Sequence, residues 1–529
     1  MSELYFRAED LKPEEIVKFF VASELDEQTV EALQSRRPII IVGSRGVGKS
    51  FLMRYAAAKQ GDGYSAGGTV PVYLSFIRSG LMALQSDARF RAWMIARIAK
   101  EVIATLRKKG LLDSGSQTIS RIIDTSEKQE HRLLEISLML EREALTNKAG
   151  DSDIPDALST DDLKDAIEEI CTSLNIERVN LFIDEAAHVF SPKQQRAFFT
   201  LFRDLRSPYL TCNAAVYPGI TSYGDVFQPA HDATFIRLDR DLWAPSYVDC
   251  MKDMVAKQAS SELLKVVERE PENFRALAYA STGNPRILLK TLTEAKKLSS
   301  KEIQSVFRTF YRETVWGDHS LLGDTYRGHR SIIDWGRKFV EQVVADRLGA
   351  KSSGVTNPVS FWVHRDAPEG VHAACRILEY SGIIRESGRA IRATRGAIGN
   401  RYLVNLGTIA GAQSLTSSQL LQLISNSKVD RIAEFGANYF EFQEMQGLDK
   451  HIQDAGVLDV ITERLASSVD VLDLTAWQLQ QLRNIDFKTV RDVLDCTEED
   501  LHEIPYVGPA RSRQMKNAAE AAVLEFLSG

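Results

Sequence analysis

The chain has 529 residues, more than one hydrophobic core usually serves, and its 44% hydrophobic and 26% charged residues are typical of a globular protein. The net charge of −7 argues against general coating of nucleic acid, although it allows one local basic face. The five cysteines lack metal-ligand spacing, and no apolar run reaches the roughly 18 residues of a membrane-spanning helix. We therefore expect a cytoplasmic protein with no signal peptide and no membrane contact.

The first half of the chain predicts strands that alternate with helices. Residues 1–36 carry apolar residues at helical spacing and predict an N-terminal helical segment. Residues about 85–170 predict long amphipathic helices that form an insertion. Short apolar runs predict buried parallel strands at 38–42, 70–76, 178–183, 209–217 and 233–238. The pattern predicts an α/β core over 37–245, with a parallel sheet covered by helices on both faces.

A glycine-rich loop follows the first strand and opens a helix. Gly43–Ser50 fits G-x-x-x-x-G-K-[ST] at every fixed position, which is the phosphate-binding P-loop pattern. Glycines let the backbone wrap a phosphate, and the helix start offers N–H groups to it. Lys49 should reach the β- and γ-phosphates, and Ser50 should hold Mg²⁺. We expect ATP and Mg²⁺ as cofactors, with ATP bound by Gly43, Ser44, Arg45, Gly46, Val47, Gly48, Lys49, Ser50 and Phe51.

An acidic pair follows the buried run at 178–183. A carboxylate at the end of a buried strand is costly unless it meets a cation or water. Asp184 is placed to hold Mg²⁺ through a water, and Glu185 is placed to orient the attacking water as general base. We expect Glu185 and Lys49 to be catalytic.

The strands stop after Trp243, and residues 246–311 predict a helical lid. Arg286 follows a Gly-Asn-Pro turn in this lid, where an arginine can fold over the γ-phosphate. The P-loop, the Asp-Glu pair and Gly-Asn-Pro-Arg together resemble the initiator-like, origin-recognition branch of AAA+ ATPases and the related STAND regulators, over roughly residues 20–300. The resemblance implies a P-loop NTPase fold and a catalytic sensor-2 role for Arg286.

The same resemblance implies further site residues. A polar sensor-1 residue should stand near the end of the strand at 209–217, with Asn213 and Thr221 as candidates. AAA+ sites usually form between subunits, so a homo-oligomer is implied, with an arginine finger that reaches a neighbour's nucleotide. If no arginine acts as a finger, the STAND interpretation is favoured, because STAND proteins work as switches that hydrolyse ATP slowly. The candidates for the finger are Arg203, Arg206, Arg237 and Arg240.

Residues 312–410 predict helices followed by a hairpin, with strands at 382–385 and 401–405 and a turn near Gly388. Residues 312–406 hold fourteen basic and ten acidic residues. Initiator-like ATPases carry a winged helix here, so the resemblance implies contact with double-stranded DNA. The alternative is a hairpin that packs on the ATPase or on a protein partner. The predicted phosphate contacts are Arg385, Arg389, Arg392 and Arg395.

The end of the chain predicts a helical connector at 411–469 and an all-helical domain at 470–529. Residues 482–510 resemble tandem helix-hairpin-helix modules, whose glycine turn offers N–H groups to a DNA phosphate. Tyr506 replaces the first glycine of that turn, and residues 470–529 hold six basic and eleven acidic residues. Phosphate contact and protein docking therefore both stay open.

These patterns predict an ATPase that converts ATP to ADP and phosphate and controls an assembly on DNA. The alternative is a STAND-like switch or oligomerising scaffold that acts through a protein partner with little turnover. No nuclease, protease or metal-centre pattern is visible, so either role needs a partner. From the resemblance alone, a bacterial antiviral or DNA-maintenance system would suit both.

Overall fold

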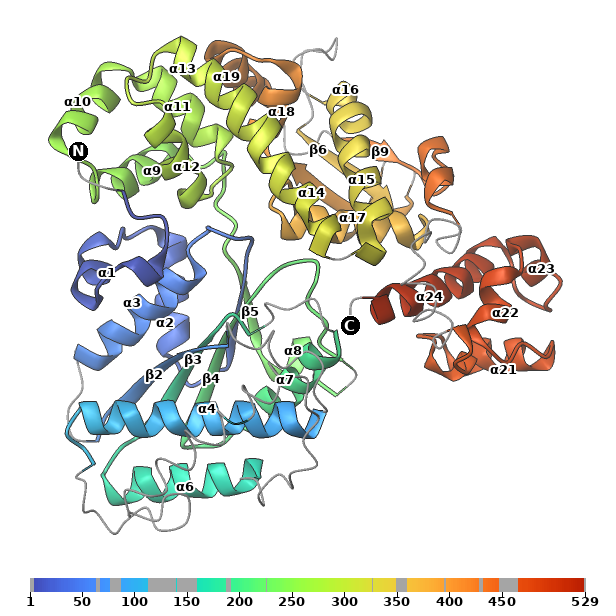
Figure 1. The fold of residues 1–529 in the computed structure, drawn as a ribbon, viewed down its shortest axis with the longest axis horizontal. Helices are drawn as coiled ribbons and strands as arrows, with labels where there is room; N and C mark the ends of the chain where they lie inside the picture. Colours follow the sequence, from blue (N-terminus) through green and yellow to red (C-terminus); the bar gives the residue numbers. More distant parts are fainter. Residues whose placement is uncertain are drawn as a thin grey trace. The chain divides into compact units, whose positions relative to one another are not determined.

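The computed structural model of the chain divides into two compact units, residues 1–259 and residues 260–529 (Figure 1). Among the described helices, none is long and apolar enough to cross a bilayer. The described residues are 4–62, 67–76, 87–112, 139, 159–186, 192–224, 226–325, 327–348, 359–393, 396–427, 432–446 and 465–527.

A five-stranded parallel sheet forms the centre of the first unit, in the order β2-β3-β4-β1-β5. The strands are β1 (Ile39–Val42), β2 (Thr69–Ser75), β3 (Arg178–Asp184), β4 (Leu210–Val216) and β5 (Thr234–Arg237). β1, β3 and β4 are buried along their whole length, as expected for parallel strands covered on both faces. The α/β core with a parallel sheet covered by helices on both faces, predicted from the sequence, is confirmed.

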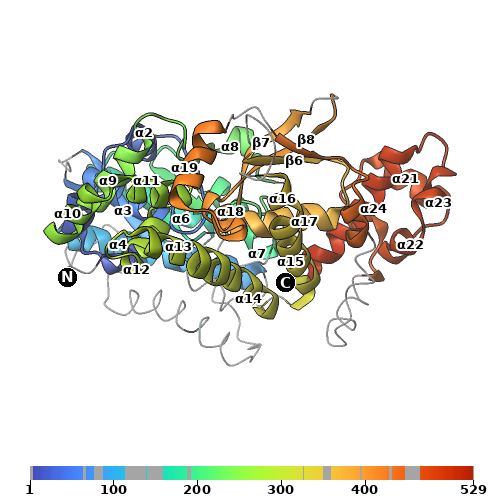
Figure 2. The same cartoon turned by 90° about the horizontal axis from the view of Figure 1, so that it is seen from above.

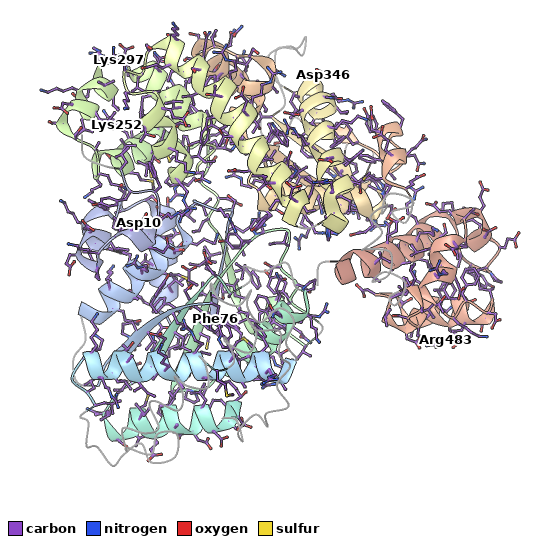
Figure 3. The ribbon with its side chains drawn as sticks, in the orientation of Figure 1. Asp10, Phe76, Lys252, Lys297, Asp346 and Arg483 are labelled. Atoms are coloured by element: carbon purple, nitrogen blue, oxygen red, sulfur yellow. The ribbon has the colours of Figure 1, made fainter. Side chains whose placement is uncertain are left out.

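Helices cover both faces of this sheet. Ile39 and Ile41 of β1 share an apolar cluster with α2 and α3, whereas Ile40 belongs to a second cluster with α4, α6 and α7. Phe76, just past β2, lies against Trp93 of α4 with the ring centroids 5.3 Å apart (Figure 3). The described helices of the unit are α1 (Pro13–Phe19), α2 (Glu24–Gln34), α3 (Lys49–Asp62), α4 (Asp87–Lys108), α6 (Thr160–Ser173), α7 (Pro192–Asp204), α8 (Pro229–Asp232) and α9 (Tyr247–Ala256).

The boundary between the units lies inside the predicted lid, residues 246–311. The first helix of that segment, α9, belongs to the first unit. Its Met251 is fully buried, and the side chain of Gln258 just after it accepts a hydrogen bond from the backbone N–H of Tyr5 at 3.1 Å. The predicted start of the lid therefore differs from the structural boundary.

Helices open the second unit and continue through most of it. Two of its helical runs, 300–325 and 330–347, each contain a π-helical stretch. The described helices before the last domain are α10 (Ser261–Arg269), α11 (Pro271–Ala280), α12 (Pro285–Glu294), α13 (Ser300–Val306), α14 (Val315–Thr325), α15 (Arg330–Lys338), α16 (Ala345–Arg347), α17 (Glu369–Tyr380), α18 (Leu406–Gln413) and α19 (Ser417–Asn426).

The second unit also contains a four-stranded sheet in the order β7-β8-β6-β9. β7 and β8 form the predicted hairpin, but they do not turn near Gly388, because their pairing continues to Arg392 and Ile398. Beyond that pair, the N–H of Ala393 donates to the oxygen of Ala397 at 2.8 Å, and Gly396 has a φ of 78°. Gly388 lies inside β7 at an irregularity of the register, where an added Cβ would come within 3.2 Å of Ile391. The strands are β6 (Ser360–His364), β7 (Ile384–Arg392), β8 (Ile398–Val404) and β9 (Ile432–Phe435).

β9 corrects the predicted helical connector at 411–469. This strand pairs in parallel with β6 and so completes the sheet. Its Phe435 is fully buried, with ring centroids 5.1 Å from Phe339 and 6.1 Å from Phe361. Burial of one aromatic side chain beside β6 outweighs the weak local pattern of a four-residue segment.

The last domain is helical and has its own apolar cluster, which includes Leu482, Val493 and Met515. Asn517 of its last helix donates to the backbone oxygen of Ala367 at 3.0 Å, which ties the domain to the β6–α17 loop. Its described helices are α21 (Ala476–Asn484), α22 (Val490–Asp495), α23 (Glu498–His502) and α24 (Pro509–Leu527).

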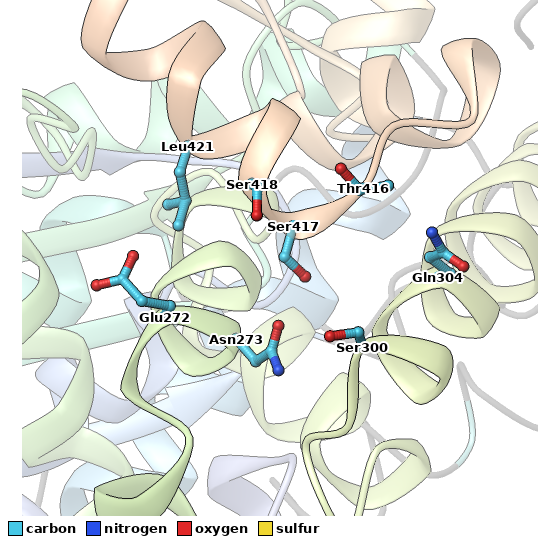
Figure 4. A pocket seen from close by; sticks show the side chains of 8 residues that line it. All are labelled: Glu272, Asn273, Ser300, Gln304, Thr416, Ser417, Ser418 and Leu421. Atoms are coloured by element: carbon cyan, nitrogen blue, oxygen red, sulfur yellow. The ribbon is translucent and has the colours of Figure 1, made fainter.

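A cavity of about 470 Å³ lies in the second unit where α11, α13 and α19 begin (Figure 4). Hydroxyl and amide side chains dominate its lining, among them Asn273, Ser300, Gln304 and Ser417. The cavity contains none of the residues predicted to bind a nucleotide.

Candidate functional site

The glycine loop connects the end of β1 to the start of α3. Gly46 and Gly48 have φ values of 89° and 109°, which only glycine adopts readily. An added Cβ at Gly43 would lie 2.6 Å from Cγ2 of Val47, so the loop could not close in this form with a larger residue there. An added Cβ at Gly48 would meet no atom beyond its chain neighbours within 4 Å, so the loop is open on that side.

Lys49 is buried at the first position of α3. Its Nζ donates to the backbone oxygens of Gly43 at 2.6 Å and Ser44 at 3.1 Å. The ammonium is therefore held at the mouth of the loop. Its contact with the β- and γ-phosphates stays a prediction.

Tyr217 is a site residue that the sequence patterns did not reveal. It follows β4 directly. The centroid of its ring lies 4.1 Å from Nζ of Lys49 and 5.6 Å from the guanidinium carbon of Arg45. The ring therefore stabilises two cations of the loop. The sequence signal was an aromatic residue one position past a buried strand, which becomes informative only when β4 is known to lie beside β1.

The structure corrects one of the two sensor-1 candidates. Asn213 pairs in register with Ile39, the first residue of β1. It therefore lies toward the amino-terminal ends of the parallel strands, and the glycine loop follows the carboxyl end of β1. Its buried amide donates to the oxygens of Leu33 and Asn180 and accepts from the N–H of Ile39, which makes it part of a structural network. Thr221 donates to the oxygen of Tyr217 at 2.6 Å, and its sensor role stays a prediction.

Asp184 ends β3, one strand away from β1 on the other side of β4. The side chain is 2% exposed, and both carboxylate oxygens accept hydrogen bonds. One bond comes from the hydroxyl of Tyr73 on β2 at 2.7 Å, and the other from the backbone N–H of Glu185 at 2.9 Å. Burial, then the charge of Asp184, raises the pKa of Tyr73 well above its usual value, so this hydroxyl stays a donor.

Glu185 brings the two motifs together. Burial raises the pKa of its carboxyl group, and the negative charges of Asp184 and Glu9 raise it further, while Arg45 and Lys49 of the glycine loop lower it. The two motifs lie at the carboxyl ends of the parallel strands β1 and β3, which are separated by β4 alone. The backbone of Glu185 has a φ of 53°, unusual for a residue with a side chain and often found at functional sites.

The residues of this edge fit ATP and Mg²⁺. Leu52 is the first residue of α3 whose N–H bonds back to the loop, at the oxygen of Gly48, so the N–H groups of Ser50 and Phe51 have no helical acceptor. These donors, the open side of Gly48 and the ammonium of Lys49 suit phosphate oxygens. Ser50 would supply an oxygen ligand to the metal ion, and Asp184 would hold the ion through a water.

Three of the four arginine-finger candidates make contacts inside their own unit. Arg240 is 8% exposed and bonds both to Asp26 and to the backbone of the glycine loop, so it cannot reach a neighbouring subunit in this form. Arg237 pairs with Asp239, and Arg203 donates to the oxygen of Val226. Arg206 is exposed, and for it the prediction stands as made.

Arg286 lies in the second unit, at the start of α12. Asn284 caps this helix by accepting from the N–H of Ile287 at 3.3 Å, and Gly283 has a φ of 78°. The Gly-Asn-Pro turn is therefore the N-terminal cap that sets the direction of α12. The sensor-2 role of Arg286 stays a prediction.

Figure 2 shows the hairpin formed by β7 and β8. Its arginines lie in different settings. Arg392 is exposed near the end of β7, and Arg389 is exposed beside Glu386, with Nε 3.1 Å from its carboxylate. Arg385 is partly buried, and Arg395 lies outside the described residues. Arg401 of β8 is held across the hairpin by Ser387.

Comparisons with known proteins agree with the resemblance over the start of the chain. A family model described as ORC-CDC6-like matches residues 4–60, from the N-terminal helices through the glycine loop and most of α3. The match includes the glycine loop, which is the first of the motifs that carry the resemblance. No curated protein matches the chain significantly.

Two solved structures resemble the chain weakly. The Walker-type ATPase PABY2304 of Pyrococcus abyssi is 13% identical with a TM-score of 0.36, covering 78% of this chain and 98% of its own. The Aeropyrum pernix Orc1 protein in complex with DNA is 11% identical with a TM-score of 0.31, covering 78% and 95%. Similarity at this level does not indicate a function for this chain.

Proposed function

We propose that the chain is an ATPase that binds Mg²⁺-ATP at Gly43–Ser50 and hydrolyses it with Glu185. The observation that carries the proposal is the meeting of two motifs at one edge of the sheet. Lys49 follows the glycine loop at the carboxyl end of β1, and Glu185 follows Asp184 at the carboxyl end of β3, with β4 between these two strands. A base near the phosphate-binding cations is what hydrolysis of a phosphoanhydride requires.

Each residue has a defined task in this proposal. The loop N–H groups and Lys49 bind and orient the phosphates, and bound Mg²⁺-ATP supplies the transferable phosphoryl group and the metal's charge. Asp184, whose carboxylate accepts a hydrogen bond from Tyr73, would help to hold the metal ion. Glu185 accepts a proton from the attacking water.

The hairpin β7–β8 supports contact with double-stranded DNA. Arg389 and Arg392 are exposed on one strand, and phosphate contacts from such residues bind DNA without reading its sequence. The proposed role is control of an assembly on DNA by copies of this chain, in DNA maintenance or antiviral defence.

Steady-state ATP hydrolysis tests this function. Wild-type protein should turn over ATP, and double-stranded DNA should stimulate it. Glu185→Gln should lower turnover at least about 100-fold, because it keeps the size of the side chain but cannot accept the proton. Turnover that survives this substitution would reject Glu185 as the base.

A switch with little turnover is the second candidate. It is favoured by the contacts of Arg203, Arg237 and Arg240 within their own unit, which occupy three of the four candidates for a finger. Tight ATP binding without turnover, with or without DNA, would support the switch and direct the search to a protein partner.

A further inference from the structure

Arg240 occupies a buried position between the N-terminal helices and the glycine loop. It follows β5, and its side chain is 8% exposed. Nη2 donates to both carboxylate oxygens of Asp26 on α2, at 3.0 and 3.1 Å, while Nη1 donates to the backbone oxygen of Val47 at 3.0 Å. One guanidinium thus connects α2 to the tip of the loop.

The acid of this pair is itself held in place. Asp26 is 2% exposed, its Oδ2 accepts from the hydroxyl of Ser23 at 2.5 Å, and its N–H donates to the same hydroxyl at 3.2 Å. Ser23 is the N-cap of α2. A planar guanidinium bound by both oxygens of a fixed carboxylate has little freedom to turn.

The contact with Val47 sets the orientation of the peptide group between Val47 and Gly48. In a planar trans peptide, the C=O of one residue and the N–H of the next point to opposite sides. With the oxygen of Val47 held by Arg240, the N–H of Gly48 must point away from Arg240. That N–H has no acceptor within the described part of the chain, and Gly48 borders open space.

We propose that Arg240, held by Asp26, is a positioning residue for nucleotide binding, because it turns the N–H of Gly48 toward the phosphates. The inference rests on the proposed function, since it assumes that ATP binds in this loop. It assigns Arg240 a role in its own subunit in place of an arginine finger, and it gives Asp26 a role in ATP affinity from outside the loop.

Equilibrium binding of Mg²⁺-ATP to the full chain, together with the thermal unfolding midpoint of the nucleotide-free protein, tests the proposal. Arg240→Gln should raise the Kd for ATP about tenfold, the loss expected for one well-placed hydrogen bond to a charged group. Asp26→Asn should raise it less, since Arg240 still reaches Val47. Arg240→Lys should fall between Arg240→Gln and wild type.

Arg178 provides the matched control. It is also buried, at 5% exposure, also donates to a backbone oxygen, that of Gln34 at 2.8 Å, and also pairs with an acid, Glu177. It opens β3, at the end of that strand opposite Asp184. Arg178→Gln should lower the unfolding midpoint but leave the Kd for ATP within about twofold of wild type, because lost packing alone does not reach the loop.

Two outcomes would overturn the inference. One is an unchanged Kd in folded Arg240→Gln, or in Arg240→Lys and Asp26→Asn if the glutamine variant does not fold. The other is an equal rise of the Kd in Arg178→Gln, which would show a general effect of stability. Wild-type protein that binds no ATP would instead reject the proposed function itself.

Discussion

At the scale of single residues, Glu185 carries the chemistry and also bears an electrostatic cost. Its carboxylate is partly buried, the charges of Asp184 and Glu9 raise its pKa further, and the cations Arg45 and Lys49 of the glycine loop oppose this rise. The raised pKa means that the folded protein keeps this group protonated to a higher pH than the unfolded chain does. The wild-type fold therefore loses stability as the pH rises through that pKa.

Glu185→Gln should accordingly raise the unfolding temperature of the nucleotide-free protein at neutral pH, because the variant has no charge to bury. The gain should shrink as the pH falls and vanish below the pKa of a glutamate in the unfolded chain, where wild type is neutral as well. Thermal unfolding at several pH values measures this. A gain that is the same at every pH would contradict the assigned electrostatics.

Sequence patterns predicted the residues of this site that act through local chain geometry. Lys49 and the glycines were identifiable because their motif is contiguous, and Asp184 because it ends an apolar run. Tyr73 and Tyr217 were missed, since their contacts depend on which strands lie side by side. Asn213 was misplaced because a polar residue in a strand does not reveal which end of the sheet it is near.

At the scale of elements, the hairpin β7–β8 carries the exposed arginines Arg389 and Arg392 on a paired strand. Its strands pair over most of their length, and Tyr402 of β8 is buried against Phe361. The sequence predicted a hairpin here but not the position of its turn, because Gly388 lies at a register irregularity inside β7, where an added Cβ would come within 3.2 Å of Ile391. β9 was not predicted from the sequence, because its pairing partner β6 lies about 70 residues earlier and local patterns do not reveal such a contact.

Removal of two exposed arginines tests the hairpin. The double variant Arg389→Ala, Arg392→Ala should weaken binding to double-stranded DNA about tenfold. It should also reduce the salt dependence by roughly two counterions, since each phosphate contact contributes a slope of about 0.9. Fluorescence anisotropy with labelled DNA at several salt concentrations measures both.

The control for the hairpin removes the same charge elsewhere on the second unit. Lys296 and Lys297 are exposed between α12 and α13, and Lys297 is labelled in Figure 3. Lys296→Ala, Lys297→Ala should leave DNA binding nearly unchanged. Equal losses in the two double variants would mean that net charge, and not the hairpin, attracts DNA.

At the scale of the whole molecule, the two predicted activities reside in different compact units. The glycine loop, Asp184 and Glu185 all belong to residues 1–259, together with Asp26 and Arg240, which brace the loop. The hairpin and Arg286 belong to residues 260–529. ATP binding should therefore depend on the first unit, and its coupling to DNA on the second.

The central claim is that ATP binds at the glycine loop, and equilibrium titration of the full chain with Mg²⁺-ATP tests it most directly. Lys49→Met should weaken binding at least about tenfold, because it removes the cation that meets the phosphates while keeping a long side chain. Lys59→Met, an exposed position on the same helix, should bind like wild type. Equal affinity in all three proteins would contradict the account.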